Sequence, residues 1–207
     1  MVTSCRTATL LPMPRVPGDV AIVIGSNTQE LGADRKEDAG PAMVRAAFGA
    51  KAAVALASHG YRNGKAPKAD PLLGNVPTQV MTDMWFRWLA HRMRDAGTRV
   101  WRYEFGFGAL GSGKPPKHTT EMDYVYHARP SATAPGGWPP VQRYWANFIR
   151  NGDPNEESLP VWPMMTKGDD SLSIAPHGIT TELGARAKLC NLMFQGVDYP
   201  SSPALPN

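Results

Sequence analysis

A continuous apolar run near the N-terminus constrains the fold more than any other feature of this sequence. Residues 20–24 spell VAIVI, and Gly25 ends the run. The short length and the β-branched side chains predict a strand rather than a helix. A strand without polar alternation is typical of a parallel sheet, in which both faces of the strand are covered. We therefore expect a buried strand of a parallel sheet here.

A second strand is predicted at residues 100–105, which spell VWRYEF. Three aromatic side chains alternate with Arg102 and Glu104, the period of two shown by a strand with one apolar face. A loop rich in glycine and proline follows and leads to His118, with Glu121 three residues later. Functional side chains often lie on a loop that a rigid element positions, so His118 is the first candidate for catalysis.

Two nucleotide-binding patterns compete for the loop itself. Gly106, Gly108 and Gly111 spell G-x-G-x-x-G, and residues 108–114 spell G-x-x-x-x-G-K. Both patterns hold phosphate only where the glycines lead into the N-terminus of a helix. Here two prolines follow, and the first replaces the Ser or Thr that would bind magnesium. A domain that binds ATP or NAD therefore remains only a disfavoured alternative.

The stretch that begins at His118, HTTEMDYVY, resembles the type-B carboxylesterase, or cholinesterase-like, family. In that family a strand of the form vYrYeF leads to H-G-x-E-[LI]-x-[YF]-V-F, and the His is the base of a catalytic triad. The resemblance implies this role for His118. Thr119 departs from the pattern, because the family usually has Gly there and a Thr adopts a positive φ only at an energetic cost.

The first predicted strand and its following loop carry a second match to the family. Residues 20–30, VAIVIGSNTQE, resemble a strand of the form vPllvG followed by [GV]-x-N-x-[DQ]-E, in which the Glu is the triad acid. The resemblance implies this role for Glu30. The acid precedes the His, as in α/β-hydrolases. In such a pair the carboxylate fixes the imidazole tautomer and stabilises the imidazolium.

A third match to the family is the most specific of the three, and it implies a structural role and not a catalytic one. Residues 144–155, YWANFIRNGDPN, precede the Trp-Pro pair at 162–163 and resemble the family pattern yWanFarTGdPN followed by WP. An apolar helix face precedes the Asn-Gly-Asp-Pro-Asn turn, which should end the helix. The resemblance implies that this helix and turn support the back of the His loop.

A strong amphipathic helix is predicted from about residue 79 to Gly97, with Met and Trp along one face. The resemblance makes Trp85 and Phe86 candidates for the substrate pocket. His91 lies on the other side and is expected to be exposed. The arginines of this helix are expected to form a solvated face rather than a nucleic-acid surface.

Two further helices are expected. One is opened by Pro41 and ends near His59, which we expect to be a helix-end residue and no ligand. The other begins at about Thr181 and places Cys190 on an apolar stripe. The family often has a Cys there, but its usual disulfide partner is absent from the corresponding region of this sequence. We therefore expect Cys190 to be a free, buried thiol.

Two parts of the esterase machinery are missing from the 207 residues. No G-x-S-x-G presents a nucleophile, and no upstream Gly-Gly stretch builds an oxyanion hole. Ser26 and Ser112 lack the pattern of a nucleophile. The chain is thus expected to supply His118 and Glu30 of a Ser-His-Glu triad that hydrolyses small-molecule carboxylic esters, and to be inactive alone. The alternative is a non-catalytic, cholinesterase-like binding module.

The resemblance covers residues 18–195 and implies an incomplete fold. These residues would form the C-terminal portion of an α/β-hydrolase domain, a few sheet strands packed by helices. Residues 1–17, which prolines interrupt, would form an irregular segment, and residues 196–207 a tail. The missing N-terminal part of the domain is a candidate partner.

Composition excludes other classes of protein. With 42% apolar and 19% charged residues and a net charge of +4, the chain is typical of soluble globular proteins and not of nucleic-acid binders. No apolar run reaches the ~18 residues of a membrane span. Without CxxC or HExxH, neither a metal nor another cofactor is expected. No signal-peptide core is present, which predicts a cytoplasmic protein if Met1 is the true start and leaves secretion open if the chain is truncated.

Overall fold

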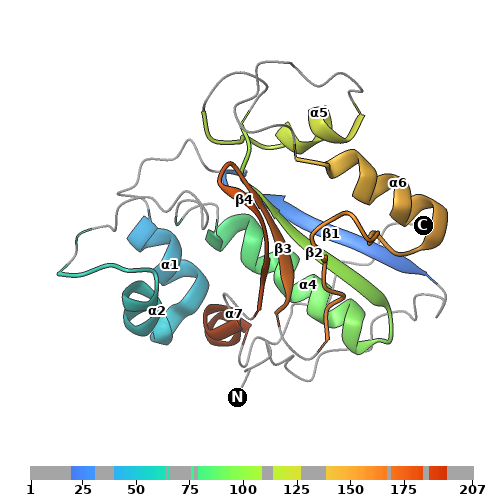
Figure 1. Ribbon diagram of the computed structural model, residues 1–207. Helices are drawn as coiled ribbons and strands as arrows, with labels where there is room; N and C mark the ends of the chain where they lie inside the picture. Colours follow the sequence, from blue (N-terminus) through green and yellow to red (C-terminus); the bar gives the residue numbers. More distant parts are fainter. Residues whose placement is uncertain are drawn as a thin grey trace, which may run out of the picture.

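The computed structural model describes residues 20–30, 40–63, 65, 76, 79–108, 114–126, 139–166, 169–183 and 187–194 (Figure 1). Its elements in chain order are β1 (Ala21–Asn27), α1 (Gly40–Phe48), η2 (Gly49–Lys51), α2 (Ala52–Ser58), η3 (Gln79–Asp83), α4 (Met84–Asp95), β2 (Arg99–Phe105), α5 (Thr120–Tyr126), α6 (Val141–Asn151), β3 (Ser171–Ala175), β4 (Gly178–Glu182) and α7 (Ala187–Phe194).

The sheet has the strand order β1-β2-β3-β4. Strands β1, β2 and β3 are parallel, and β4 returns antiparallel to β3. Ala21 is paired with Arg99 at the start of the first two strands, and Asn27 with Phe105 at their end. The two predicted strands are therefore confirmed as parallel neighbours, and their carboxyl ends lie at the same edge of the sheet.

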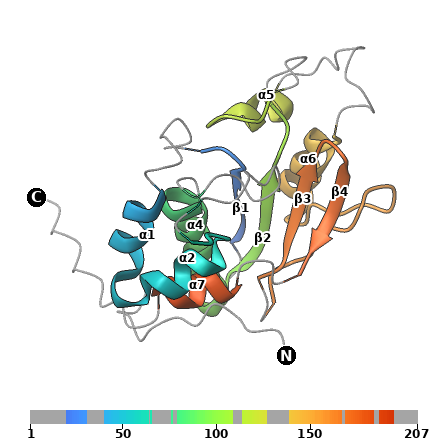
Figure 2. The ribbon, with the colours of Figure 1, turned by 90° about the vertical axis from the view of Figure 1, so that its left-hand side faces the viewer.

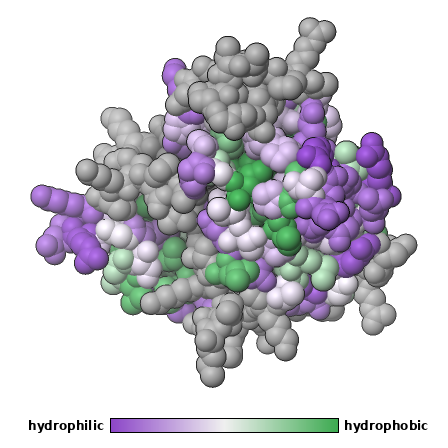
Figure 3. Space-filling view, viewed as in Figure 1, coloured by the Kyte–Doolittle hydropathy of each residue, from purple (hydrophilic) through white to green (hydrophobic). Residues whose placement is uncertain are grey.

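Helices cover both faces of the sheet, which confirms the α/β class. Figure 2 shows α1, α2, α4 and α7 on one side and α6 on the other. Figure 3 shows apolar surface over the middle of the face seen in Figure 1, with hydrophilic side chains over α6. No helix within the described ranges is long and apolar enough to cross a membrane.

The C-terminal part corrects two predictions. Thr181 lies in strand β4, and the last helix begins only at Ala187, because the β-branched residues after Gly178 pair with β3 instead. Gly178 has a φ of 141°, which suits glycine at the hairpin turn. Cys190 is fully buried as expected, but it is disulfide-bonded and not a free thiol. The sequence contains one other cysteine, Cys5, outside the described residues.

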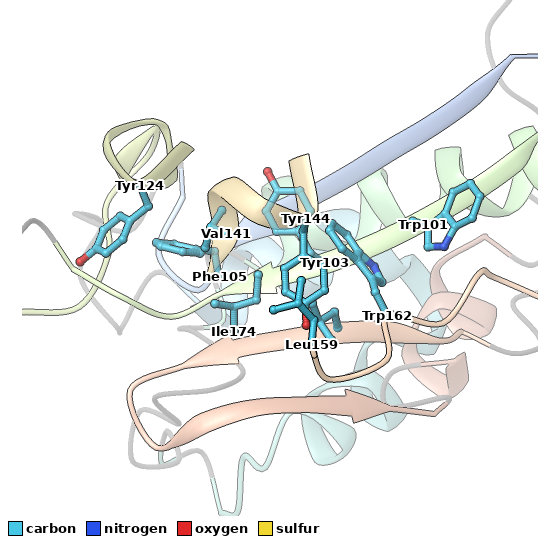
Figure 4. Close-up of a cluster of buried hydrophobic side chains, with 10 residues drawn as sticks. Trp101, Tyr103, Phe105, Tyr124, Val141, Tyr144, Leu159, Trp162 and Ile174 are labelled. Carbon is cyan, nitrogen blue, oxygen red and sulfur yellow. The ribbon is translucent and has the colours of Figure 1, made fainter. Parts of the chain in front are cut away.

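The apolar face of β2 packs against α6 and the turn that follows it (Figure 4). The ring of Tyr103 lies edge-on to Trp145, with centroids 5.2 Å apart, and to Trp162 at 6.0 Å. Trp162 Nε1 also donates a hydrogen bond of 2.7 Å to the carbonyl of Arg102. Gly25 of β1 leaves room for Tyr103, since a Cβ there would lie 2.3 Å from the Tyr103 ring.

The Asn-Gly-Asp-Pro-Asn turn ends α6 as the sequence predicts. Gly152 caps the helix with a φ of 68°, and its N–H donates to the carbonyl of Phe148 at 2.8 Å. Asn155 then binds the backbone of Trp162 twice, through its Oδ1 at 2.7 Å and its Nδ2 at 2.9 Å. This third motif therefore fixes Trp162 under β2, behind the strand that leads to His118.

The opposite face of β2 is charged but buried. Arg102 and Glu104 point toward η3 and α4. Asp83 at the end of η3 and Arg87 and His91 of α4 lie four residues apart and face the sheet. Asp169, which precedes β3, completes the group. We name these six residues the ionic cluster, and all of them are buried. The predictions that Arg87 lies on a solvated face and that His91 is exposed are therefore both wrong.

The ionic cluster is densely paired. Asp83 accepts hydrogen bonds from Arg87 Nε at 2.9 Å and from Arg102 at 2.6 Å. Arg87 also pairs with Glu104 and Asp169. Burial alone would raise the pKa of the Asp169 carboxyl, but the charges of Arg87 and Arg102 and the nearby His91 side chain hold it well below its usual range.

Strand β1 is less covered than the sequence predicts. Its first five residues are half-buried, and Val20 is 37% exposed. The cause is its position, since β2 alone pairs with it among the described strands. The expectation of burial on both faces is therefore wrong for this chain, although the parallel pairing is confirmed.

The connection from β2 to α5 contains a strained residue. Thr119 has a φ of 69°, in the left-handed region that a β-branched side chain rarely adopts. Its Oγ1 donates a hydrogen bond of 2.6 Å to the carbonyl of His118. Thr120 begins α5, and its Oγ1 accepts the N–H of Lys117 at 2.9 Å. The residue that departs from the family pattern thus takes the conformation for which glycine is suited.

We expect Asp169→Asn to lower the free energy of unfolding by about 3–5 kcal/mol at pH 7, since it leaves buried guanidinium charge uncompensated. A lowered folded-state pKa stabilises the protein above the unfolded pKa of about 3.9, and this contribution is lost as the pH falls further. Urea unfolding of both proteins at several pH values would measure the difference, which should shrink in acid. Asp95→Asn, at an exposed ion pair at the end of α4, should cost at most about 1 kcal/mol.

We expect Thr119→Gly to stabilise the protein by up to about 1 kcal/mol, because it removes the strain of a positive φ, offset in part by the greater freedom of glycine in the unfolded chain. Thermal and urea unfolding would measure the gain. Thr120→Gly is the control and should destabilise the protein, since Thr120 has a helical conformation. Equal losses of stability in both variants would show that the positive φ of Thr119 does not strain the protein.

Candidate active site

His118 and Glu30 lie in contact at the carboxyl edge of the sheet. Glu30 follows the end of β1 by three residues, and His118 lies in the turn before α5. His118 Nδ1 forms a hydrogen bond with Glu30 Oε2. Parallel pairing of β1 and β2 explains this, because both loops leave the same edge of the sheet. The structure thus joins the two residues that the sequence motifs single out.

The carboxylate of Glu30 is buried and held from its other side. Glu30 is only 6% exposed, and its Oε1 accepts hydrogen bonds from the backbone N–H of Asn27 at 2.8 Å and from Asn27 Nδ2 at 3.1 Å. The N–H of Thr28 still donates to the carbonyl of Phe105 at 2.9 Å, so the strand ladder anchors this loop. Glu30 therefore presents Oε2 to the imidazole in a defined direction.

A second carboxylate belongs to the same hydrogen-bond network. Asn27 Nδ2 also donates to Oε2 of Glu121, on the first turn of α5. Sequence reasoning gave neither Asn27 nor Glu121 a role. Both occupy fixed positions of the quoted family patterns, which is the signal that could have drawn attention to them.

Helix α5 is anchored beside β2 by Tyr124. Its ring packs 5.1 Å from that of Phe105, and its hydroxyl donates to the carbonyl of Gly108 at 2.7 Å. Burial, with the nearby charge of Asp123, raises the pKa of Tyr124, so the phenol stays protonated and remains a donor. This anchor positions the turn that carries His118.

The imidazole of His118 is held on one side and open on the other. Its side chain is 52% exposed, whereas that of Glu30 is 4% exposed. Within the described part of the chain, Nε2 makes no hydrogen bond. Nδ1 is thus occupied by the carboxylate, and Nε2 is free to exchange a proton with another molecule or chain segment.

Tyr103 lies below the two carboxylates. Burial raises its pKa strongly, and the negative charges of Glu121 and Glu30 raise it further. The phenol therefore stays neutral at any physiological pH. Its ring also packs between Trp145 of α6 and Trp162, which fixes its place on β2.

The candidate pocket residues lie at the start of α4. Trp85 is exposed and lies edge-on to Trp88, and Phe86 is half-buried. Asp83, at the end of η3, accepts a hydrogen bond of 3.2 Å from Ser26, next to Asn27. The start of α4 therefore lies at the same end of the sheet as the His–Glu pair. A pocket role for Trp85 and Phe86 stays a prediction.

Of the two candidate serines, only Ser26 lies in the described structure, and its hydroxyl is not bonded to His118. Ser26 is buried, and its hydroxyl is directed to Asp83 on the α4 side of the sheet. Ser112 lies outside the described residues. Among the residues that are described, no group of three His, Cys, Asp or Glu side chains could hold a metal ion.

The nucleotide alternative gains no support. Residues 109–113 lie outside the described ranges, and Lys114 is exposed. After it, the chain passes through Pro115 and Pro116, and the next helix begins at Thr120. A phosphate site of either pattern needs the helix N-terminus directly after the glycines.

Comparison with known proteins gives a consistent picture. No family model matches the chain. Carboxylesterase 1C of Mus musculus is 33% identical over 117 residues, 51% of this chain and 21% of that protein. Liver carboxylesterase of Sus scrofa is 32% identical over 111 residues, 48% of this chain and 19% of that protein. Carboxylesterase 4A of Bos taurus is 30% identical over 117 residues, 51% of this chain and 20% of that protein.

The aligned part of the chain therefore spans about a fifth of the length of the curated relatives it matches. The α/β sheet packed by helices agrees with the class expected from the motifs. Over about half of its length, this chain is similar to part of the carboxylesterases, the family that its three sequence motifs indicate.

Proposed function

We propose that this chain supplies the base and the acid of a serine carboxylesterase, with His118 as the base and Glu30 as the acid. The observation that carries the proposal is the hydrogen bond from His118 Nδ1 to the buried Glu30 carboxylate, while the imidazole side chain is half exposed. Similarity to carboxylesterases supports the reaction class. The substrate class is a small-molecule carboxylic ester, and the reaction needs no cofactor.

In the proposed reaction, Nε2 of His118 takes the proton of a serine hydroxyl as the serine oxygen attacks the acyl carbon. The same nitrogen returns the proton to the departing alcohol, and a water molecule then releases the acid by the same route. Glu30 keeps the proton of the neutral ring on Nδ1 and stabilises the imidazolium that forms. Its anchoring by Asn27 avoids reorganisation during the transfer.

The nucleophile and the oxyanion hole come from elsewhere in this proposal. The 207 residues contain no G-x-S-x-G, and Ser26 is directed to Asp83. Among the described strands, β1 has a neighbour on one side only, which supports a partner, since an open strand edge is a template for pairing with another strand. We propose that the N-terminal part of a hydrolase domain completes the sheet there and supplies the serine. This chain alone is inactive in ester hydrolysis.

A non-catalytic binding module is the second candidate. The absence of a serine nucleophile from the sequence favours it. The buried, triply hydrogen-bonded carboxylate of Glu30 argues against it, because a binding surface does not require an oriented acid behind an open imidazole. The two proposals differ in whether His118 is needed for turnover once a serine is present.

We expect the purified chain to hydrolyse a short-chain p-nitrophenyl ester no faster than its His118→Ala variant. A chimera tests the positive claim, with residues 18–195 replacing the matching part of pig liver carboxylesterase. This chimera should turn over the ester, His118→Ala should lower kcat by about 10⁶, and Glu30→Gln by about 10⁴.

His177→Ala, at an exposed turn between β3 and β4, is the matched control and should leave kcat unchanged. Turnover by the chimera that survives His118→Ala would exclude the proposed base. A folded chimera that binds the ester without turnover would favour the binding module.

A further inference from the structure

The side-chain amide of Asn27 lies between two carboxylates. Its Nδ2 donates one hydrogen bond to Oε1 of Glu30 at 3.1 Å and another to Oε2 of Glu121. Asn27 is 1% exposed, so neither bond competes with bulk water. A primary amide has two N–H donors, and here each meets a different carboxylate.

The orientation of this amide follows from its neighbours. If the amide were flipped, Oδ1 would face two ionised carboxylates, which only accept hydrogen bonds. The observed orientation instead leaves Oδ1 buried without a hydrogen-bond partner among the described residues. One unpaired oxygen costs less free energy than the flipped orientation, which would lose both charge-assisted hydrogen bonds of Nδ2.

Asn27 also holds Glu30 through its backbone. The N–H at the end of β1 donates to the same Oε1 at 2.8 Å. Two donors from one residue, which is itself fixed by pairing with Phe105, thus hold one carboxylate oxygen and leave the other for His118. Asn27 therefore fixes the orientation of Glu30 relative to the sheet, and Glu30 in turn fixes that of the imidazole.

We infer that Asn27 is the positioning residue of the His118–Glu30 pair, and that its amide links Glu121 to the same unit. Without this amide, Glu30 would lose one of the two donors that hold its Oε1 and could rotate away from His118. Glu121 would then face the Glu30 carboxylate without the donor that now lies between them. The imidazole would then lose the partner that keeps its proton on Nδ1. The catalytic meaning rests on the proposed esterase function, but the tautomer is a property of this chain alone.

The test is ¹⁵N NMR of the 207-residue chain labelled in its histidine rings, with the His118 signals identified by His118→Gln. Near pH 9, well above the ordinary imidazole pKa of about 6.5, neutral rings report which nitrogen carries hydrogen. We expect His118 to carry it on Nδ1 in the wild type. In Asn27→Leu we expect loss of this tautomer, with the hydrogen moving to Nε2.

Asn147→Leu is the matched control. Asn147 is also buried, and its Nδ2 donates to a glutamate, Glu156, at 3.0 Å, on α6 away from His118. It should lose stability as Asn27→Leu does, yet keep the Nδ1–H tautomer. Retention of that tautomer in Asn27→Leu, or its loss in both variants, would overturn the inference whatever the esterase assay shows.

A measurement on the wild type covers the case in which Asn27→Leu does not fold. The side-chain amide protons of Asn27 should exchange with solvent at least about tenfold more slowly than those of the exposed Asn151, as expected for a buried hydrogen-bonded donor. Equal exchange rates would contradict the two amide hydrogen bonds and the positioning role with them.

Discussion

Parallel pairing of β1 and β2 is the constraint on which the rest of this structure depends. Asn27 and Phe105 are partners at the ends of the two strands, and each strand then releases a loop that carries one member of the candidate pair. A slip of the register would separate Glu30 from His118 by a full pleat or more. The proposed chemistry therefore depends on backbone hydrogen bonds well below the site.

Strand β2 is fixed from both faces by different forces. On one side, aromatic rings from α6 and the turn at Trp162 bury the face of Tyr103. On the other side, the ionic cluster pairs Arg102 with Asp83 of η3 and Glu104 with Arg87 of α4. Aromatic packing stabilises through burial but tolerates small shifts, whereas buried ion pairs demand partners at defined positions. The combination gives β2 both stability and a fixed register.

Several elements could be predicted because their local signals agree with the tertiary environment. The run at residues 20–24, the alternation at 100–105 and the turn after α6 all form as expected. The burial of the charged side of β2 could not be predicted, because alternating apolar and polar residues normally indicate a strand with one solvent-exposed face. Its burial is possible only because Asp83 of η3 and Arg87 of α4 lie opposite the charged side chains of β2.

The hairpin β3–β4 and the role of Asn27 were missed for different reasons. Residues 171–182 contain two strands of five residues around a short turn, and helical spacing of later apolar residues masked the second strand. At the site, His118 and Glu30 stood out because their residue types carry proton-transfer chemistry. Asn27 carries none, and its importance lies in distances to two carboxylates that no sequence pattern contains.

The edge of β1 matters both for the packing of the sheet and for the candidate site. Its side chains are apolar along residues 21–24, yet they are half-buried, because one side of the strand has no described neighbour. An apolar edge of this kind can form backbone hydrogen bonds with another strand. The open side of His118 lies at the carboxyl end of the same sheet, so a segment that paired with β1 would also end near the imidazole. A strand added at this edge would therefore cover the apolar side chains of β1 and end beside the candidate site.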